Sequence, residues 1–220
     1  MFQNLTANET RIIACLMEKS IFTPDQYPLT LNALTNACNQ KSGRNPVMSL
    51  DKGLVKRTAR DLCDKHLLVI DENFNNGVDK YKQRFCNSTF GDTQFTPPQF
   101  AVVCLLLMRG PQTPGELRAH SGRLYTFTDN DEVVDAIDSL NALNSEPVIV
   151  QLPRTPGRKD CEYMHLFSGP IDIEVHTSKM IATNTTERIS KTDLEQRVVK
   201  LEQQVEELSA QLDSLRNSYK

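Results

Sequence analysis

Two stretches of apolar residues at helical spacing begin 90 residues apart, after Thr6 and after Thr96. Each opens with a polar string, Thr6-Ala-Asn-Glu9 or Thr96-Pro-Pro-Gln99, whose end residues are suited to bond the free N–H groups of a helix start. Pro97 fits the first helical position, where no N–H donor is needed. We therefore predict that one structural unit occurs twice in the chain.

The first repeat continues with two more helical stretches and then an alternating one. The last of its helices carries an apolar stripe at intervals of four, three and four residues, formed by Val55, Ala59, Leu62 and His66. Asn76-Gly77 is a strong signal for a hairpin turn. The predicted elements are helices over residues 30–39 and 51–66 and strands over residues 67–70 and 78–85.

The second repeat follows the same order. Thr113-Pro-Gly-Glu116 is a further capping string that opens a short helix, and Pro156-Gly157 marks a turn between two strands. The predicted elements are a helix over residues 131–143 and strands over residues 148–152 and 161–167. Three helices and a hairpin form the plan of a winged helix. The predicted fold class is mainly α with small β-hairpins (α+β), with winged-helix domains at residues 1–90 and 91–168.

The C-terminal segment has a different pattern. Residues 169–190 contain Gly169, Pro170 and a polar run, which indicates a linker. Residues 191–220 carry apolar residues in alternating steps of four and three, the heptad pattern of a coiled coil, with Leu at d and mostly Val or Leu at a. This pattern favours a parallel homodimer; the alternative is an amphipathic helix that folds back on its own chain. The candidate dimerisation residues are Leu194, Val198, Leu201, Val205, Leu208, Leu212 and Leu215.

Charge is distributed unevenly along the chain. The 220 residues carry 25 basic and 28 acidic side chains, a net charge of −3, and 39% of them are hydrophobic, as in soluble globular proteins. Residues 1–90 have a net charge of +3, residues 91–168 of −4 and residues 169–220 of −2. Only the first repeat is therefore a candidate for binding a polyanion. We expect a cytoplasmic protein with no membrane partner, because neither a secretory signal nor an apolar run of about 20 residues is present.

Basic side chains of the first repeat gather at the positions that a winged helix uses to bind DNA. On the third helix they lie opposite the apolar stripe, where the N-terminal turns of such a helix enter the major groove. On the returning strand they alternate on one face, as contacts with backbone phosphates require. The ordinary alternative is solvation of a surface helix. The candidate DNA-binding residues are Lys52, Lys56, Arg57, Arg60, Lys80, Lys82 and Arg84.

The second repeat serves as an internal control. Aligning its third helix with that of the first repeat by an offset of 78 residues keeps the apolar stripe, since Leu62 falls on Leu140. Gly53, Arg57 and Arg60 fall on Asp131, Asp135 and Asp138. Phosphate would repel this acidic face, so we expect the second repeat to contact protein.

Neither a catalytic site nor a metal site is predicted, and no cofactor is expected. The four histidines lie far apart in the sequence, outside any nucleophile or metal motif. The six cysteines form no Cys-x-x-Cys pair, and those on predicted helices are expected to be buried as small hydrophobic residues. We therefore expect that the protein is not an enzyme.

Three strings resemble the hallmark segments of the YceH-like family of bacterial proteins. They start with Cys38-Asn-Gln-Lys-Ser-Gly-Arg-Asn-Pro-Val47, continue with Leu105-Leu-Leu-Met-Arg-Gly-Pro-Gln-Thr-Pro-Gly-Glu-Leu-Arg118 and end with Leu152-Pro-Arg-Thr-Pro-Gly-Arg-Lys159 before Tyr163-Met-His-Leu166. The resemblance implies a tandem winged-helix protein from the bacterial cytosol. The chain departs from the family in two places: it has Met108 before Arg109 where the family often carries Leu-Leu-Leu-Arg-Gly, and it has His120 where arginine is common. The family supplies no catalytic residue.

Two functions remain open from the sequence. The first is a dimeric DNA-binding protein or transcriptional regulator that uses the first repeat. The alternative is a protein–protein interaction or scaffold protein built on winged-helix domains, without sequence-specific DNA binding.

Overall fold

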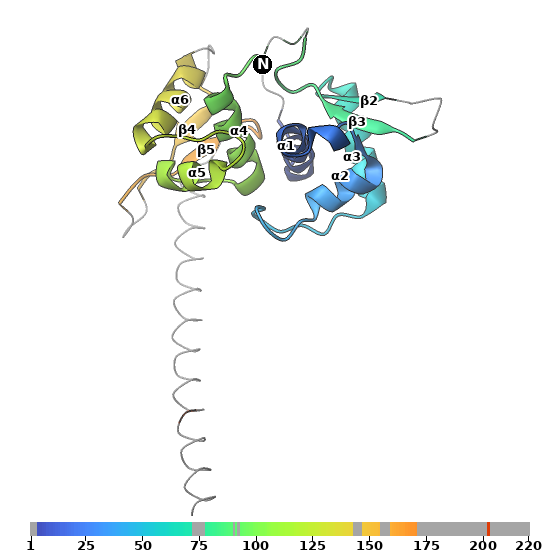
Figure 1. The fold of residues 1–220 in the computed structure, drawn as a ribbon, viewed down its shortest axis with the longest axis horizontal. Coiled ribbons are helices and arrows are strands. Elements are labelled where there is room, and N and C mark those ends of the chain that lie inside the picture. Colours follow the sequence, from blue (N-terminus) through green and yellow to red (C-terminus); the bar gives the residue numbers. More distant parts are fainter. Residues whose placement is uncertain are drawn as a thin grey trace, which may run out of the picture. The chain divides into compact units, whose positions relative to one another are not determined.

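The computed structural model describes residues 4–71, 78–89, 91, 93–142, 147–154, 159–170 and 202. Residues Met1–Ile171, which include both repeats, form one compact unit, and Asp172–Lys220 form another. The first unit is a mixed α/β structure with six α-helices and two small antiparallel sheets in its described part. Figure 1 shows the helices and strands of this unit. The domain boundary at residue 90 stays a prediction.

The first repeat has three α-helices and a three-stranded sheet. The strand order is β1-β3-β2, so β3 pairs with both of the other strands, and both pairings are antiparallel. The element bounds are α1 Ala7–Phe22, the 3₁₀ turn η1 Pro24–Gln26, β1 Leu29–Thr30, α2 Leu31–Cys38, α3 Lys52–Asp64, β2 Leu68–Asp71 and β3 Lys80–Gln83.

The second repeat has the same order of elements without the extra strand. Its two strands form an antiparallel pair in which Ile149 lies opposite His165. The element bounds are α4 Pro97–Arg109, α5 Pro114–Ser121, α6 Asn130–Ala142, β4 Ile149–Gln151 and β5 Tyr163–His165. The predicted sequence of three helices and a hairpin therefore occurs twice.

The helices of the two repeats begin at matching cap residues. The predicted capping boxes of α1 and α5 form: the Thr6 hydroxyl accepts from the Glu9 N–H at 3.3 Å and the Thr113 hydroxyl accepts from the Glu116 N–H at 3.2 Å. At the start of α4, the Thr96 N–H donates to Gln99 Oε1 at 2.9 Å. Two aspartates cap the third helices, because Asp51 accepts from the Leu54 N–H at 2.9 Å and Asp129 from the Glu132 N–H at 2.8 Å. Local hydrogen bonding thus fixes where these helices start.

Two details of the first repeat differ from the sequence prediction. The strand β1 was not predicted, because two residues are too short to show alternation; Leu29 lies opposite Tyr81. The placement of His66 on the apolar stripe of α3 is wrong. His66 is exposed, with φ of 60°, and lies beyond the helix end in a Schellman turn. In this turn the His66 N–H bonds to the Cys63 carbonyl and the Leu67 N–H bonds to the Leu62 carbonyl, both at 2.9 Å.

The core runs through both repeats. In α1 the residues from Glu9 to Met17 are all buried, and in α4 those from Gln99 to Met108 are. A helix buried on every side is surrounded by protein, and α1 and α4 pack against each other. Cys104 Sγ lies 3.7 Å from the Ala14 carbonyl oxygen, and these two positions are themselves 90 residues apart. Equivalent positions of the two repeats therefore meet at this helix contact.

Several predicted features fall outside the described residues. They are both hairpin turns, at Asn76-Gly77 and Pro156-Gly157, most of the linker and all seven candidate dimerisation residues. Within residues 191–220 only Glu202 is described, and it is helical and exposed. Among the described residues, no helix is both long enough and apolar enough to cross a membrane. All six cysteines are free thiols. Of the four on helices, Cys15, Cys38 and Cys104 are buried as expected, whereas Cys63 is half-buried. Cys86, which lies outside the helices, is also buried.

Candidate functional site

The basic face of the first repeat comprises the seven candidate DNA-binding residues on α3, on β3 and directly after β3. Along α3, Val55, Thr58, Ala59 and Leu62 are buried. The cationic residues occupy the other side of the helix, with Lys56 half-buried and Lys52, Arg57 and Arg60 exposed. The apolar stripe of α3 thus directs its basic side chains outward, and α3 packs against β2 beside the strand that carries the rest of the basic face.

The strand β3 alternates as predicted. Tyr81 and Gln83 are buried, while Lys80 is half-buried and Lys82 and Arg84 are exposed. The elements α3 and β3 approach each other near Tyr81 of β3: burial raises the pKa of its phenol, and the nearby Arg60 guanidinium of α3 lowers it in part. Arg60 on α3 therefore lies near the buried ring of Tyr81, the β3 residue between Lys80 and Lys82.

The seven cations have no anionic partner within the described part of the chain. None of them forms a salt bridge or a side-chain hydrogen bond with another described residue. At the start of α3, a Cβ on Gly53 would lie 3.0 Å from Asp51 Oδ1 and 3.6 Å from Arg57 Nη1. Glycine at this position therefore leaves room both for the aspartate cap and for the Arg57 guanidinium.

The corresponding surface of α6 is acidic. Val133, Ala136, Ile137 and Leu140 are buried, matching the buried stripe of α3. The residues that fall on Gly53, Arg57 and Arg60 are exposed and negatively charged: Asp131, Asp135 and Asp138. The alignment by 78 residues thus holds for burial, and the two helices present opposite charges.

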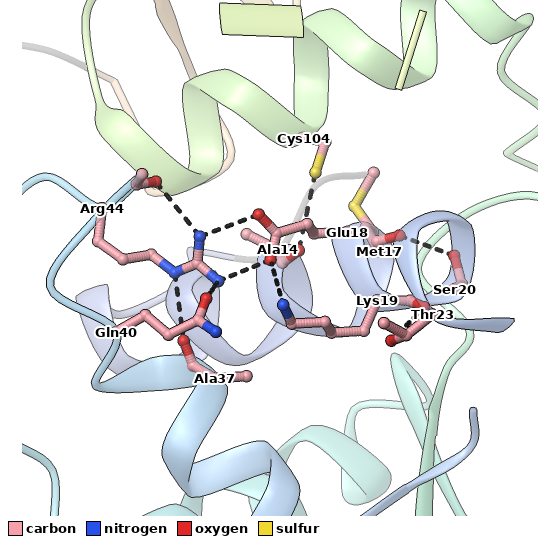
Figure 2. A network of polar contacts seen from close by, with 11 residues as sticks. Ala14, Met17, Glu18, Lys19, Ser20, Thr23, Ala37, Gln40, Arg44 and Cys104 are labelled. Atoms are coloured by element: carbon pink, nitrogen blue, oxygen red, sulfur yellow. Dashed lines mark hydrogen bonds and ion pairs between the residues drawn. The ribbon is translucent and has the colours of Figure 1, made fainter. Parts of the chain in front are cut away.

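A buried ion pair holds the loop between α2 and α3. The Arg44 side chain is 1% exposed and forms two bonds to the Glu18 carboxylate, from Nη1 to Oε1 at 2.9 Å and from Nη2 to Oε2 at 2.6 Å. Figure 2 shows Gln40 and Ala37 on the other side of the guanidinium and Lys19 against the same carboxylate. Burial lowers the pKa of Arg44, the bonds to Glu18 raise it, and the net shift is upward. Arg44 therefore stays charged and cross-links α1, α2 and the loop.

The same loop is tied to both long helices. Arg11 on α1 donates from Nη2 to the Pro46 carbonyl at 2.7 Å, and the Asn45 N–H donates to the Met108 carbonyl of α4 at 3.2 Å. Sequence reasoning missed this network, because Arg44 and Glu18 lie 26 residues apart with no periodic relation. The sequence shows only that Arg44 follows a glycine, Gly43. In the structure Gly43 has a φ of +71°.

Beside this network lies a pocket of about 280 Å³, here called the junction pocket. It is lined by α1, the loop after α2, α4 and α5, so both repeats contribute to it. Its titratable lining includes Arg109 at the end of α4 and His120 on α5. Burial lowers the pKa of His120 and the Arg109 charge lowers it further, so the imidazole is neutral at pH 7. Among the described residues, no group of three or more His, Cys, Asp or Glu side chains is arranged to hold a metal ion.

Taken together, the described part is a mixed α/β unit with two copies of one arrangement, one basic copy and one acidic copy. The family model described as "Protein of unknown function, DUF480" matches residues 5–158. The chain is 46% identical over 219 residues to a UPF0502 protein of Photobacterium profundum, covering 96% of this chain and 98% of the relative. It is 43% identical over 215 residues to a UPF0502 protein of Enterobacter sp. strain 638, covering 98% and 97%. The chain belongs to this DUF480 (UPF0502) family of bacterial proteins, which confirms the resemblance inferred from its sequence strings.

Proposed function

We propose that the protein binds double-stranded DNA through the basic face, with each repeat acting as a winged-helix domain and α3 as the recognition helix. The observation that supports this is the set of seven cations on α3 and β3 without an anionic partner among the described residues. A surface helix that only needs solubility gains from pairing its charges, since ion pairs offset mutual repulsion. An unpaired cationic surface instead matches a polyanion such as the phosphate backbone.

The geometry of the proposal divides the roles between two elements. Lys52, Lys56, Arg57 and Arg60 lie on the part of α3 that enters the major groove in helix-turn-helix proteins, where arginine can bond guanine edges. Lys82 lies on β3 and Arg84 directly after it, where a wing contacts backbone phosphates. The proposed activity is binding, not catalysis, and the regulated step is transcription.

The proposal includes a homodimer formed through the heptads from Leu194 to Leu215. A parallel coil would bring two basic faces to one duplex and raise the overall affinity through the second contact. Static light scattering of the full chain tests this part by itself. The wild type should have twice the chain mass, and Leu201→Asp with Leu208→Asp should be monomeric; a monomeric wild type would remove the dimer from the proposal.

A second candidate function is protein–protein interaction through α6. The exposed Asp131, Asp135 and Asp138 favour it, because they occupy the positions of a recognition helix and would be repelled by DNA. In this case α6 would face a basic protein partner.

Fluorescence anisotropy with a labelled duplex of about 30 base pairs, measured over a salt series, tests the DNA-binding proposal. We expect the wild type to bind with an affinity that falls steeply as salt rises. Arg57→Glu with Arg60→Glu should lower the affinity at least 100-fold at low salt and reduce the logarithmic salt slope by about two.

A matched control reverses two cations of the second repeat, Arg118→Glu with Lys159→Glu, which gives the same change in net charge. Both side chains are exposed. Equal losses in the two double variants would show a general charge effect and contradict the role of α3. If the wild type binds no duplex and instead captures a protein from nuclease-treated extract, with loss of capture in Asp135→Lys with Asp138→Lys, the second function replaces the first.

A further inference from the structure

The junction pocket has properties that the proposed DNA contact does not use. Its walls come from both repeats, and the ends of two equivalent helices meet there, because Glu18 and Lys19 of α1 lie 90 positions before Met108 and Arg109 of α4. The loop that forms one wall is fixed by the Arg44–Glu18 pair and by the bond from Asn45 to Met108. The pocket is therefore largely preformed.

Most polar groups of the pocket are already bonded within the protein. The Glu18 carboxylate is held by Arg44 and by Lys19, whose Nζ lies 3.3 Å from Oε2. The Gln40 side-chain oxygen accepts from Arg44 at 2.7 Å. The Leu105 carbonyl accepts from the Gln112 amide at 3.2 Å, and the Met108 carbonyl accepts from the Asn45 N–H. These acceptors in the lining are thus occupied, so a cationic ligand would find few free partners.

Arg109 differs from these groups. Its guanidinium forms no hydrogen bond or ion pair with any residue in the described part of the chain, although the residue is half-buried. Its Nη2 lies 3.9 Å from the place that a Cβ on Gly43 would occupy, which brings the guanidinium against the loop wall. Ser42 beside Gly43 also has an unbonded hydroxyl in this part of the structure. A fork of guanidinium donors therefore remains open at the pocket.

His120 is a further polar residue in the lining of the junction pocket. Its Nδ1 lies 2.8 Å from Gln112 Oε1, and the Gln112 amide nitrogen is used to donate to Leu105. The Gln112 oxygen must therefore accept, so Nδ1 carries the proton and Nε2 of the neutral ring has only a lone pair. The positive charge of the pocket comes from Lys19, Arg44 and Arg109 against Glu18 alone.

The rest of the lining is apolar. Phe22, Leu105, Met108 and Leu124 face the pocket together with the buried Cys104. A partly apolar pocket with one open guanidinium is suited to a ligand that has one planar anionic group and a hydrocarbon body, because the guanidinium fork matches a carboxylate with two parallel bonds.

We propose that the junction pocket is a binding site for a small organic carboxylate, with Arg109 bonding the carboxylate and the apolar lining covering the body of the molecule. This inference does not depend on DNA binding. Since the site joins both repeats, an occupied pocket adds contacts between α4 and the loop that precedes α3.

Isothermal titration of the full-length protein at low ionic strength tests the site with benzoate, phenylacetate and hexanoate as probes. We expect saturable binding of at least one of them at about one molecule per chain, with weaker or no binding of benzamide, which has the same shape without the charge. Arg109→Gln should weaken the binding about 10-fold to 100-fold, the range for loss of a charge-assisted hydrogen bond. Arg118→Gln, an exposed arginine on α5 outside the pocket lining, should bind as the wild type does.

A second measurement locates the bound probe. The amide resonances of Gly43 and Gly110 should shift on titration of the wild type, and the shifts should be absent in Arg109→Gln. A thermal melt with the wild-type midpoint shows that this variant is folded. The proposal is overturned if none of the three carboxylates binds at up to about 20 mM, if benzamide binds equally well, or if Arg109→Gln binds as the wild type does.

Discussion

The helices α3 and α6 share their packing and differ in their surface charge. In both, the residues facing the core are apolar and buried, and both start at an aspartate N-cap. Where α3 exposes Arg57 and Arg60, α6 exposes Asp135 and Asp138. The core positions of a repeat are constrained by the space between its helices, whereas solvent-facing positions are not. The surface of each copy is therefore free to take a different partner on the same frame.

The long helices show the opposite relation. α1 and α4 are alike on their buried sides, but near its C-terminal end α1 has Glu18 where α4 has Met108. Because α1 and α4 meet at equivalent positions, a charge placed in only one of them needs a partner from elsewhere, and the loop after α2 supplies it as Arg44. The first repeat thus contains a buried ion pair that the second does not need.

A large effect is expected from breaking this difference. Glu18→Gln leaves the Arg44 charge buried with no carboxylate, and should lower the free energy of unfolding by about 3 kcal/mol in urea denaturation. Replacing both residues, Glu18→Met with Arg44→Met, copies the second repeat at position 18 and should recover most of this loss. Lys19→Gln, which removes only the outer contact of Glu18, should cost under about 1 kcal/mol. A double variant no more stable than Glu18→Gln would contradict this account.

The matched core positions should respond alike. Leu62 and Leu140 are both 0% exposed and are equivalent under the 78-residue offset. Leu62→Ala and Leu140→Ala should each lower the free energy of unfolding by about 2–5 kcal/mol, from lost burial and the cavity left behind. Denaturation monitored by circular dichroism measures both. A loss below about 1 kcal/mol in one of them would show that its helix packs differently.

What the sequence predicted well is local. The helix starts follow from Thr-x-x-Glu strings, whose partners lie within one turn, and the burial of Val55, Ala59 and Leu62 follows from their spacing. The exposure of the cations on α3 could be predicted for the same reason, because the side of a helix opposite its buried stripe faces solvent.

What the sequence did not predict depends on distant contacts or on short elements. The Arg44–Glu18 pair joins a loop to a helix, and nothing periodic relates the two residues. β1 exists because two residues happen to lie beside β3, and His66 leaves the stripe because α3 ends two residues earlier. The junction pocket arises only when α1 and α4 pack together, so its lining could not be assembled from either repeat alone.

The hairpins differ in a way that pH should reveal. Gln83 in β3 lies opposite Leu68, and its amide is bonded to both backbone groups of Cys86. His165 in β5 lies opposite Ile149, is buried, and has no hydrogen-bond partner for Nδ1 among the described residues. Burial lowers the pKa of His165 to about 4. The folded ring thus stays neutral while the unfolded ring takes up a proton below its ordinary pKa of about 6.5.

It follows that His165 leaves stability unchanged above about pH 6.5 and lowers it as the pH falls from about 6.5 to about 4, by up to about 3 kcal/mol. Below the folded pKa the loss levels off. Urea denaturation of the wild type and His165→Gln across this range measures the difference. The variant should lose less stability between pH 6.5 and pH 4; parallel curves would show that His165 is solvated in the folded protein.

The smallest expected effect is a difference in stability between variants of the two N-cap aspartates, Asp51 of α3 and Asp129 of α6. Asp51→Ala and Asp129→Ala each remove an N-cap hydrogen bond and should lower the free energy of unfolding by about 1 kcal/mol.

Substitution of either aspartate by asparagine keeps the cap hydrogen bond and removes the negative charge. The first turn of α3 has no other acid, whereas that of α6 has Asp131 and Glu132, so Asp51→Asn should cost a few tenths of a kcal/mol more than Asp129→Asn. Thermal melts at low and high salt measure this gap, which should close at high salt because the interaction with the helix dipole is screened. A gap that persists in salt would mean that the Asp51 charge stabilises α3 through a contact other than the helix dipole.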